Sequence, residues 1–193
     1  GIAQGMKAIV EAAKKGGVVL KDTGDGGNAA NGDAGKVFAG NNAAGANAAA
    51  ADKAAEAVSK ASGEQILNAI VEAADGDKTG KKADQAQNPI DAAIGSADAA
   101  EAFHANMQKN AKVAAAIVLR GMAKNGKFAL QGGEKAGLKA AVEAAVAKTL
   151  GVVHKLVRDS VGGGLKKVAD EIKAAGNVDP STIEAAAGPK NPE

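Results

Sequence analysis

The sequence predicts an all-α fold: an elongated helical bundle with long polar loops and room for a few short strands. Three observations support this prediction. Alanine makes up about a quarter of the chain, well above its ordinary share, and it has the highest helix propensity of any residue. Val, Ile and Leu recur at helical spacing in several separate segments. The 26 glycines gather mostly between those segments, where they favour turns and loops.

Four segments with strong amphipathic patterns are predicted to form the frame of the bundle. The first places Ile2, Met6 and Ile9 on one stripe, and Gly16 follows as a stop signal. The last is the longest, and three glycines at 162–164 are expected to weaken or bend it. Its apolar stripe is predicted to comprise Leu138, Val142, Val146, Leu150, Val153 and Val157. The four helices are expected at 1–13, 64–74, 112–123 and 134–174.

Shorter elements are expected between these helices. Residues 46–60 form an alanine-rich helical pattern with few large apolar side chains. Ser62, followed three residues later by Gln65, predicts a capping box at the start of the next helix. Asn88 and Pro89 predict the start of a short helix that reaches Ile94, because Pro suits the first helical turn. A weak helix is expected over 98–109, and a brief extended piece over 127–130.

Long loops rich in Gly, Asn, Asp and Lys separate the helices. The longest, with Lys36-Val37-Phe38 as its one apolar anchor, is expected to be exposed, because a polar loop of this length is usually functional or mobile. The whole is expected to be one helical domain over 1–176, followed by a weakly ordered tail over 177–193. The loops are expected near residues 16–45, 75–87 and 95–111.

Composition argues against several classes of function. The net charge is only +2, the lysines are scattered, and the chain has no Trp or Tyr. Nucleic-acid binding is therefore not expected, because it needs clustered cations and stacking aromatics. No Cys is present, so the chain has no disulfide and no thiolate metal site. The longest strictly apolar run, Val113 to Leu119, is far shorter than the roughly 20 residues of a membrane-spanning helix.

No motif predicts catalysis or cofactor binding. The segment from Gly121 to Phe128 approaches a phosphate-binding loop, but Phe128 stands where a Ser or Thr is needed, and a helix rather than a strand precedes it. Likewise, no strand leads into the glycine-rich stretch 24–29. His104 and His154 have no metal-ligating neighbours at suitable spacing. Ser160, Asp159 and His154 would share one helix without a nucleophile elbow. We therefore predict that the protein is not an enzyme and has no cofactor. No catalytic, cofactor-binding or metal-binding residues are predicted.

Three lysines in the loop 75–87, namely Lys78, Lys81 and Lys82, form a candidate anion-binding loop. A solvated loop that contributes only to solubility is the alternative explanation, and it is the more common one.

One segment is specific enough to carry a family resemblance. Residues 107–130, and above all Arg120-Gly121-Met122-Ala123-Lys124, closely resemble the most constant segment of the Vls and variable large protein (Vlp) family of Borrelia-type spirochaetes. Further stretches match the same family in its order. They are Gly35-Lys36-Val37-Phe38, Ser62-Gly63-Glu64-Gln65-Ile66-Leu67, Asn88-Pro89-Ile90 and Gly164-Leu165-Lys166-Lys167-Val168.

The resemblance implies an antigenically variable surface lipoprotein of the outer membrane, anchored on its extracellular face by a lipidated N-terminal Cys that this sequence lacks. Host antibodies are the implied partners, and immune evasion is the implied role. The alternative is an adhesin that binds host glycosaminoglycan, extracellular matrix or serum protein through its lysine-bearing loops. Oligomeric state stays open. Variation is expected in 17–34, 40–50, 75–87 and 95–111. Candidate epitope residues of the constant segment are Lys112, Arg120, Lys124, Asn125 and Lys127.

Overall fold

The fold is described from a computed structural model, which places residues 1–21, 23, 24, 26, 30–40, 46–76, 78–96, 100–130 and 135–176. Within these residues all regular structure is helical, which confirms the predicted all-α class. The predicted tail over 177–193 lies outside the described residues. The elements are α1 (Ile2–Lys15), the 3-10 helix η1 (Gly32–Phe38), α2 (Ala48–Lys60), α3 (Gly63–Ala73), α4 (Pro89–Ile94), the 3-10 helix η2 (Ala105–Met107), α5 (Asn110–Gly121) and α6 (Lys135–Gly176).

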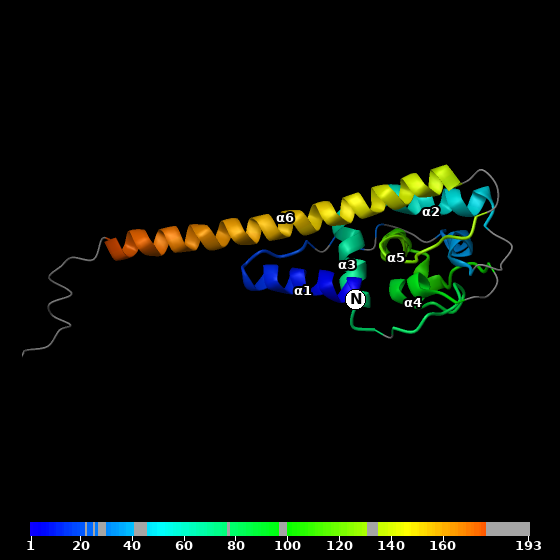
Figure 1. Cartoon of the computed structure of the whole chain (residues 1–193), viewed down its shortest axis with the longest axis horizontal. Coiled ribbons are helices and arrows are strands. Elements are labelled where there is room, and N and C mark those ends of the chain that lie inside the picture. The colour runs from blue at the N-terminus through cyan, green and yellow to red at the C-terminus, as the bar shows by residue number, and fades with distance from the viewer. Residues whose placement is uncertain are drawn as a thin grey trace, which may run out of the picture.

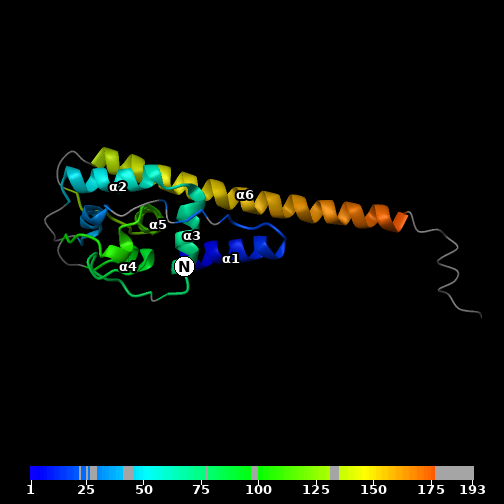
Figure 2. The same ribbon diagram turned by 180° about the vertical axis from the view of Figure 1, so that it is seen from behind.

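The molecule is elongated along α6, which is the longest helix. Its N-terminal half runs beside α2 and across α3 and α5, whereas its C-terminal end projects past every other helix (Figures 1 and 2). The helix α1 lies beside the middle of α6, and its end at Gly16 approaches Ser160. No helix in the described part of the chain combines the length and apolar character needed to cross a bilayer.

The centre of the bundle is α5, against which α2, α3, α4 and α6 all pack. Every side chain from Val113 to Arg120 is buried. Three consecutive alanines at 114–116 allow neighbouring helices to approach closely, and Val113, Ile117 and Leu119 supply larger apolar area. The helix predicted over 112–123 therefore forms the core of the domain.

Local capping signals are confirmed at two helix starts. The Ser62 hydroxyl accepts a hydrogen bond from the Gln65 backbone N–H at 3.2 Å, and the Gln65 side chain accepts one from the Ser62 N–H at 2.8 Å. At α4 the Asn88 side chain accepts from two backbone N–H groups of the first turn, with Pro89 inside that turn. These bonds satisfy donors that have no partner within the helix.

The predicted loop over 16–45 is partly wrong, because it contains the buried helix η1. Val37 and Phe38 lie in the core, and the Phe38 ring packs against Phe103 and Phe128 with centroids 5.1 and 5.6 Å away. A Cβ atom on Gly35 would collide with the backbone of Phe103. The sequence pattern missed η1 because its partners come from distant segments, and tertiary burial outweighs weak local propensity here.

The weak helix expected over 98–109 is also largely absent. Residues 97–99 lie outside the described residues, residues 100–104 are not helical, and only η2 forms a single short turn. Phe103 and Met107 nevertheless bury their side chains and hold this segment on the core. The extended piece expected over 127–130 contributes one isolated parallel bridge, between Leu130 and Ala46.

The helix α6 differs from the prediction in two respects. It continues without a break through Gly162, Gly163 and Gly164. The predicted stripe is confirmed in part: Leu138 and Val153 are buried and Val142, Val146 and Leu150 are half-buried, but Val157 is exposed. A Cβ atom on Gly63 of α3 would collide with the Lys148 backbone, which shows how close the two helices are. The buried residues are Leu138, Ala141, Ala145, Thr149, Val153 and Leu156.

Candidate functional site: the Arg120 cavity

Arg120, near the end of α5, is the most heavily bonded side chain around a cavity between α1, α4 and α5. Its guanidinium donates four hydrogen bonds to backbone carbonyl oxygens, and its side chain is only 6% exposed. Nε donates to Ala93 at 2.9 Å and Nη2 to Ala92 at 3.1 Å. Nη1 donates to Phe38 at 2.8 Å and to Lys127 at 3.3 Å. One side chain therefore connects α4, η1 and the turn that follows α5.

The charge of Arg120 is stabilised by dipoles and aromatic rings. Ala92 and Ala93 belong to the last turn of α4, where the helix dipole favours a cation. The guanidinium carbon lies 4.9 Å from the centre of the Phe38 ring and 6.0 Å from that of Phe128. Burial lowers the pKa of Arg120 to about 10. Since this value is well above neutrality, Arg120 keeps its positive charge inside the protein.

Two glycines make room for this arrangement. Gly95 has a φ of +67°, and a Cβ atom there would collide with Nη2 of Arg120. At Gly126, a Cβ atom would collide with the Arg120 carbonyl oxygen. The positive φ at Gly95 is a conformation that other residues adopt only with strain. The chain can therefore close around Arg120 because side chains are missing at these two positions.

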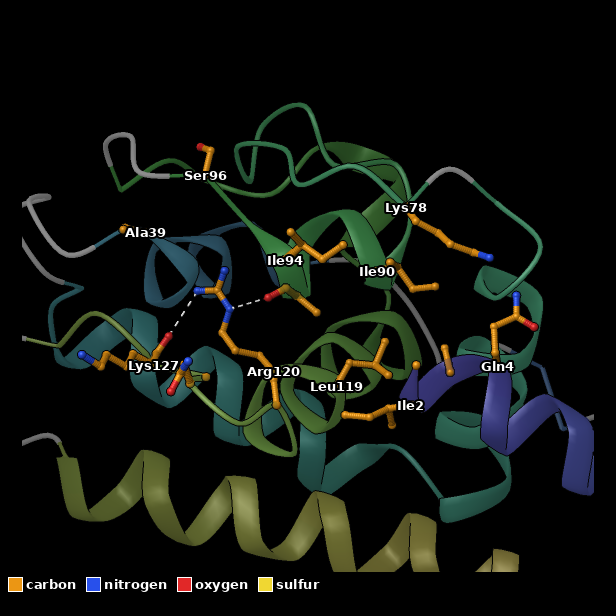
Figure 3. A pocket seen from close by; sticks show the side chains of 17 residues that line it. Ile2, Gln4, Ala39, Lys78, Ile90, Ile94, Ser96, Leu119, Arg120 and Lys127 are labelled. Atoms are coloured by element: carbon orange, nitrogen blue, oxygen red, sulfur yellow. Dashed lines mark hydrogen bonds between the residues drawn. The ribbon is translucent and has the colours of Figure 1, made fainter.

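The cavity has a volume of about 660 Å³ and a predominantly apolar wall. Ile90 and Ile94 of α4 line it together with Leu119 of α5 and Ile2 of α1, which lie next to each other in Figure 3. Polar side chains of the lining are those of Gln4, Lys78, Ser96, Arg120, Asn125 and Lys127. Among the described residues no Asp or Glu lines it.

The structure separates the candidate epitope residues of the constant segment. Lys124, Asn125 and Lys127 are exposed on the turn after α5, whereas Lys112 is half-buried in the first turn of that helix. The prediction of Arg120 as an epitope residue needs correction, because Arg120 is only 6% exposed and offers little of its side chain to an antibody. Its charge suggested exposure, and only the surrounding carbonyl groups explain why it is buried.

The three lysines of the candidate anion-binding loop do not share one environment. Lys78 is exposed at the rim of the cavity, and Lys82 is half-buried. Lys81 Nζ lies 3.3 Å from Oδ2 of Asp91, whose side chain is fully buried. Lys81 therefore forms an ion pair with Asp91. This pair was not predicted, because no sequence pattern around Asp91 indicates that it is buried.

The cavity brings together residues from two candidate sites that the sequence analysis treated as separate. Lys78 of the loop 75–87 and Arg120, Asn125 and Lys127 of the constant segment line the same space. The apolar members of the wall, above all Ile94, were not predicted as site residues. No local signal identifies them, because the wall is assembled from elements far apart in the chain.

The histidines do not form a metal site with other described residues, where no group of three or more His, Cys, Asp or Glu has metal-binding geometry. His104 Nδ1 accepts a hydrogen bond from the Asn106 backbone at 3.1 Å and so caps η2. His154 is exposed on α6, and the nearby Asp159 pairs with Lys155. These side chains are explained by helix capping and surface ion pairs.

Comparisons with known proteins agree with one another. A family model described as Borrelia lipoprotein matches residues 1–172. Variable large protein 4 of Borrelia hermsii is 32% identical over 93% of this chain and 53% of its own length. Variable large protein 14 of the same species is 35% identical over 89% of this chain and 48% of its own length. The chain thus spans about half the length of the curated relatives it matches.

A solved structure shows the same fold. The crystal structure of the Lyme disease variable surface antigen VlsE of Borrelia burgdorferi superposes with a TM-score of 0.79 and 48% sequence identity. The match covers 88% of this chain and 65% of that one.

Proposed function

The chain belongs to the Borrelia lipoprotein family, and we propose that it is the variable-loop region of an outer-surface lipoprotein that serves immune evasion. Its relatives are named as variable large proteins and as a variable surface antigen. The proposed location is the extracellular face of the outer membrane, with a lipid anchor supplied by sequence outside this chain. The proposed partners are host antibodies.

The observation that carries this proposal is the separation of a buried frame from exposed polar loops. Residues 113–120 are entirely buried, whereas Lys78, Thr79 and Gly80 are exposed in the loop that precedes α4. Substitutions at exposed positions away from special contacts usually change stability little. Such loops can therefore change what an antibody contacts while the helical core keeps its packing.

Buried residues within the loops limit where variation is expected. Ala83 and Ala86 lie inside the expected variable segment 75–87, and Phe103 and Met107 lie inside 95–111, yet all four are buried. Exchanging them would open cavities or overfill the core. We therefore expect sequence variation only at the exposed positions of these segments.

Comparing sequences of clones recovered from immune-competent and antibody-deficient hosts tests the proposal. Amino-acid changes are expected to concentrate at exposed loop positions, and only under antibody pressure. Exposed positions on the outer face of α6, such as Lys139 and Glu143, are the matched control, because they are equally accessible but lie on the helical frame. Equal rates of amino-acid change at loop and α6 positions would contradict the proposal that the loops are the variable surface presented to antibodies.

Antibody binding gives an independent measurement. Serum raised against this chain is expected to lose more binding to a Lys78→Glu variant than to a Lys139→Glu variant, because Lys78 lies in a presented loop. Circular dichroism checks that both variants stay folded. Equal loss at the two positions would contradict the proposal.

A further inference from the structure

We propose that α3 and α5 hold the segment after α1 by its main chain, so that the side chains of this segment can change while its path stays the same. The segment, here called the strap, comprises residues 18–21, 23, 24 and 26. It leaves the end of α1 and turns back along that helix towards α3 (Figures 1 and 2). The inference rests on the proposed function for its purpose, because it states how a presented loop can vary without being displaced.

Side-chain amides of the two helices bond the strap at its backbone carbonyl oxygens. Asn68 Nδ2 donates to the Lys21 carbonyl at 2.8 Å, and Gln65 Nε2 donates to the Thr23 carbonyl at 2.9 Å. Asn110 Nδ2 donates to the carbonyl of Gly26. Every residue type carries a backbone carbonyl, so these three bonds do not depend on which residues accept them.

The side chains of the strap alternate between the protein and the solvent. Val18 and Leu20 are half-buried and pack against the core. Val19 is 67% exposed, and Lys21 and Thr23 are exposed as well. Alternation of this kind is typical of an extended segment with one face on the protein. The exposed side chains can therefore be exchanged with little loss of packing.

Gln65 serves two purposes at the start of α3. Its Oε1 accepts the Ser62 N–H of the capping box, whereas its Nε2 reaches the Thr23 carbonyl. Asn68 follows three residues later, and this spacing places both amides on one face of the helix. The local signal that starts α3 therefore also fixes the position of an anchor for the strap.

Two residues of the expected variable segment 17–34 are exceptions. Gly26 has a φ of +74°, and a Cβ atom there would lie 3.2 Å from the Gln65 side-chain oxygen. Asn31 is buried, and its amide donates to the Gln108 carbonyl at 2.9 Å and to Asn110 Oδ1 at 2.7 Å. A side chain at position 26 would press on an anchor, and replacing Asn31 would remove the donor to Asn110. Both residues are expected to stay unchanged where Lys21 and Thr23 vary.

Bonds from side chains to distant carbonyl groups also occur outside the strap. Lys148 of α6 donates to the carbonyls of Val58 and Ser59 at 2.8 and 3.2 Å, near the end of α2. By contrast, Lys81 and Asp91 are joined through their side chains. A change at Lys81 would remove that contact, whereas a change at Lys21 leaves the bond to its carbonyl in place.

Backbone order parameters from ¹⁵N relaxation of the 193-residue chain test the anchoring. Values of about 0.8 are expected at Lys21 and Thr23, as in rigid backbone. The variant Q65E/N68D keeps the capping oxygen and the size of both side chains but removes both donors. Values below about 0.6 are expected for this variant. Values below about 0.6 in the parent chain, or rigid values in Q65E/N68D, would overturn the proposal.

Two further variants separate the lost bonds from the added charge. Asn68→Ala removes one donor without adding a carboxylate and should lower the order parameter at Lys21 by at least about 0.1. Gln85→Glu adds a carboxylate at an exposed position outside the strap and should leave the strap unchanged. Loosening by Gln85→Glu together with no effect of Asn68→Ala would show that charge, and not the missing bond, moves the strap.

Exchanging the exposed side chains tests the second half of the proposal. The variant V19T/K21E/T23A should keep strap order parameters within about 0.05 of the parent. Loosening of the strap in this variant would show that its side chains hold it, and main-chain anchoring would fail. None of these measurements involves an antibody. If the strap is anchored as proposed but Lys21 and Thr23 do not vary among clones, the immune-evasion proposal fails for this loop and the anchoring stands.

Discussion

Arg120 Nη1 donates a 2.8 Å hydrogen bond to the carbonyl oxygen of Phe38, which joins the end of α5 to the end of η1 across 82 residues of sequence. The same guanidinium bonds the last turn of α4. Three segments with no local relation to one another therefore depend on one side chain. The stability and the cavity of the domain are both organised around it.

Replacing Arg120 by Met is expected to destabilise the domain by at least about 3 kcal/mol, because buried carbonyl oxygens lose their donors. Arg120→Lys should give an intermediate loss, since an ammonium keeps the charge but cannot reproduce the planar fork. Urea denaturation followed by circular dichroism measures both. Arg158→Met, at an exposed position on α6, is the control and should stay within about 0.5 kcal/mol of the parent. A similarly small effect at Arg120 would show that its bonds contribute little.

Two glycine substitutions are expected to have opposite signs. Gly95→Ala should destabilise by about 2 kcal/mol or more, because φ there is positive and the new methyl group would meet the Arg120 guanidinium. Gly151→Ala should stabilise by about 0.5 to 1 kcal/mol, because Gly151 lies within α6 with open space around it. Thermal denaturation of both variants checks the signs. Destabilisation by Gly151→Ala would mean that α6 packs more tightly there than described.

The pH dependence of stability is expected to include a contribution from Glu56 of α2. Hydrogen bonds from Lys60 at 2.5 Å and Lys53 at 2.9 Å lower the pKa of Glu56 from 4.5 to about 2. A carboxyl whose pKa is lower in the folded state stabilises the fold above about pH 4.5, and this stabilisation disappears as pH falls towards 2. Melting temperatures between pH 5 and pH 2 should therefore fall less steeply for Glu56→Gln than for the parent.

Removing the partners of Glu56 is the control for that prediction. A K53M/K60M variant should show the same flattened profile, and 1 M NaCl should reduce the difference because these side chains are accessible to solvent. An unchanged slope in Glu56→Gln would show that other carboxyl groups determine the acid sensitivity.

The two halves of α6 are expected to differ in amide hydrogen exchange. Side chains up to Leu156 pack on the bundle, whereas Val161, Leu165, Val168 and Ile172 are exposed. Helices gain most of their stability from tertiary packing, so residues 161–176 of this chain should exchange faster than residues 138–156. Mass spectrometry of peptides from the two regions measures the difference. Equal protection would show that a partner, such as a second copy, covers the exposed stripe in solution.

Elements with local causes can be predicted from the amino-acid sequence alone. The Ser62–Gln65 capping box, the Asn88-Pro89 helix start and the run of alanines in α5 each depend on residues within four positions of one another. Periodicity predicted a strong amphipathic helix over 112–123, whereas the burial of every side chain from Val113 to Arg120 came from the structure. The family resemblance likewise rested on contiguous residues around Arg120.

Features that depend on distant partners could not be predicted in this way and were found in the folded structure. The burial of η1 follows from the contacts of Phe38 with Phe103 and Phe128, which no pattern within η1 contains. Arg120 can be buried because carbonyl groups from three segments converge on it and Gly95 leaves it space. Ile94 and Lys78 become cavity neighbours through the same convergence. Local propensities amount to about 1 kcal/mol or less per residue, so long-range burial and hydrogen bonding decided these features.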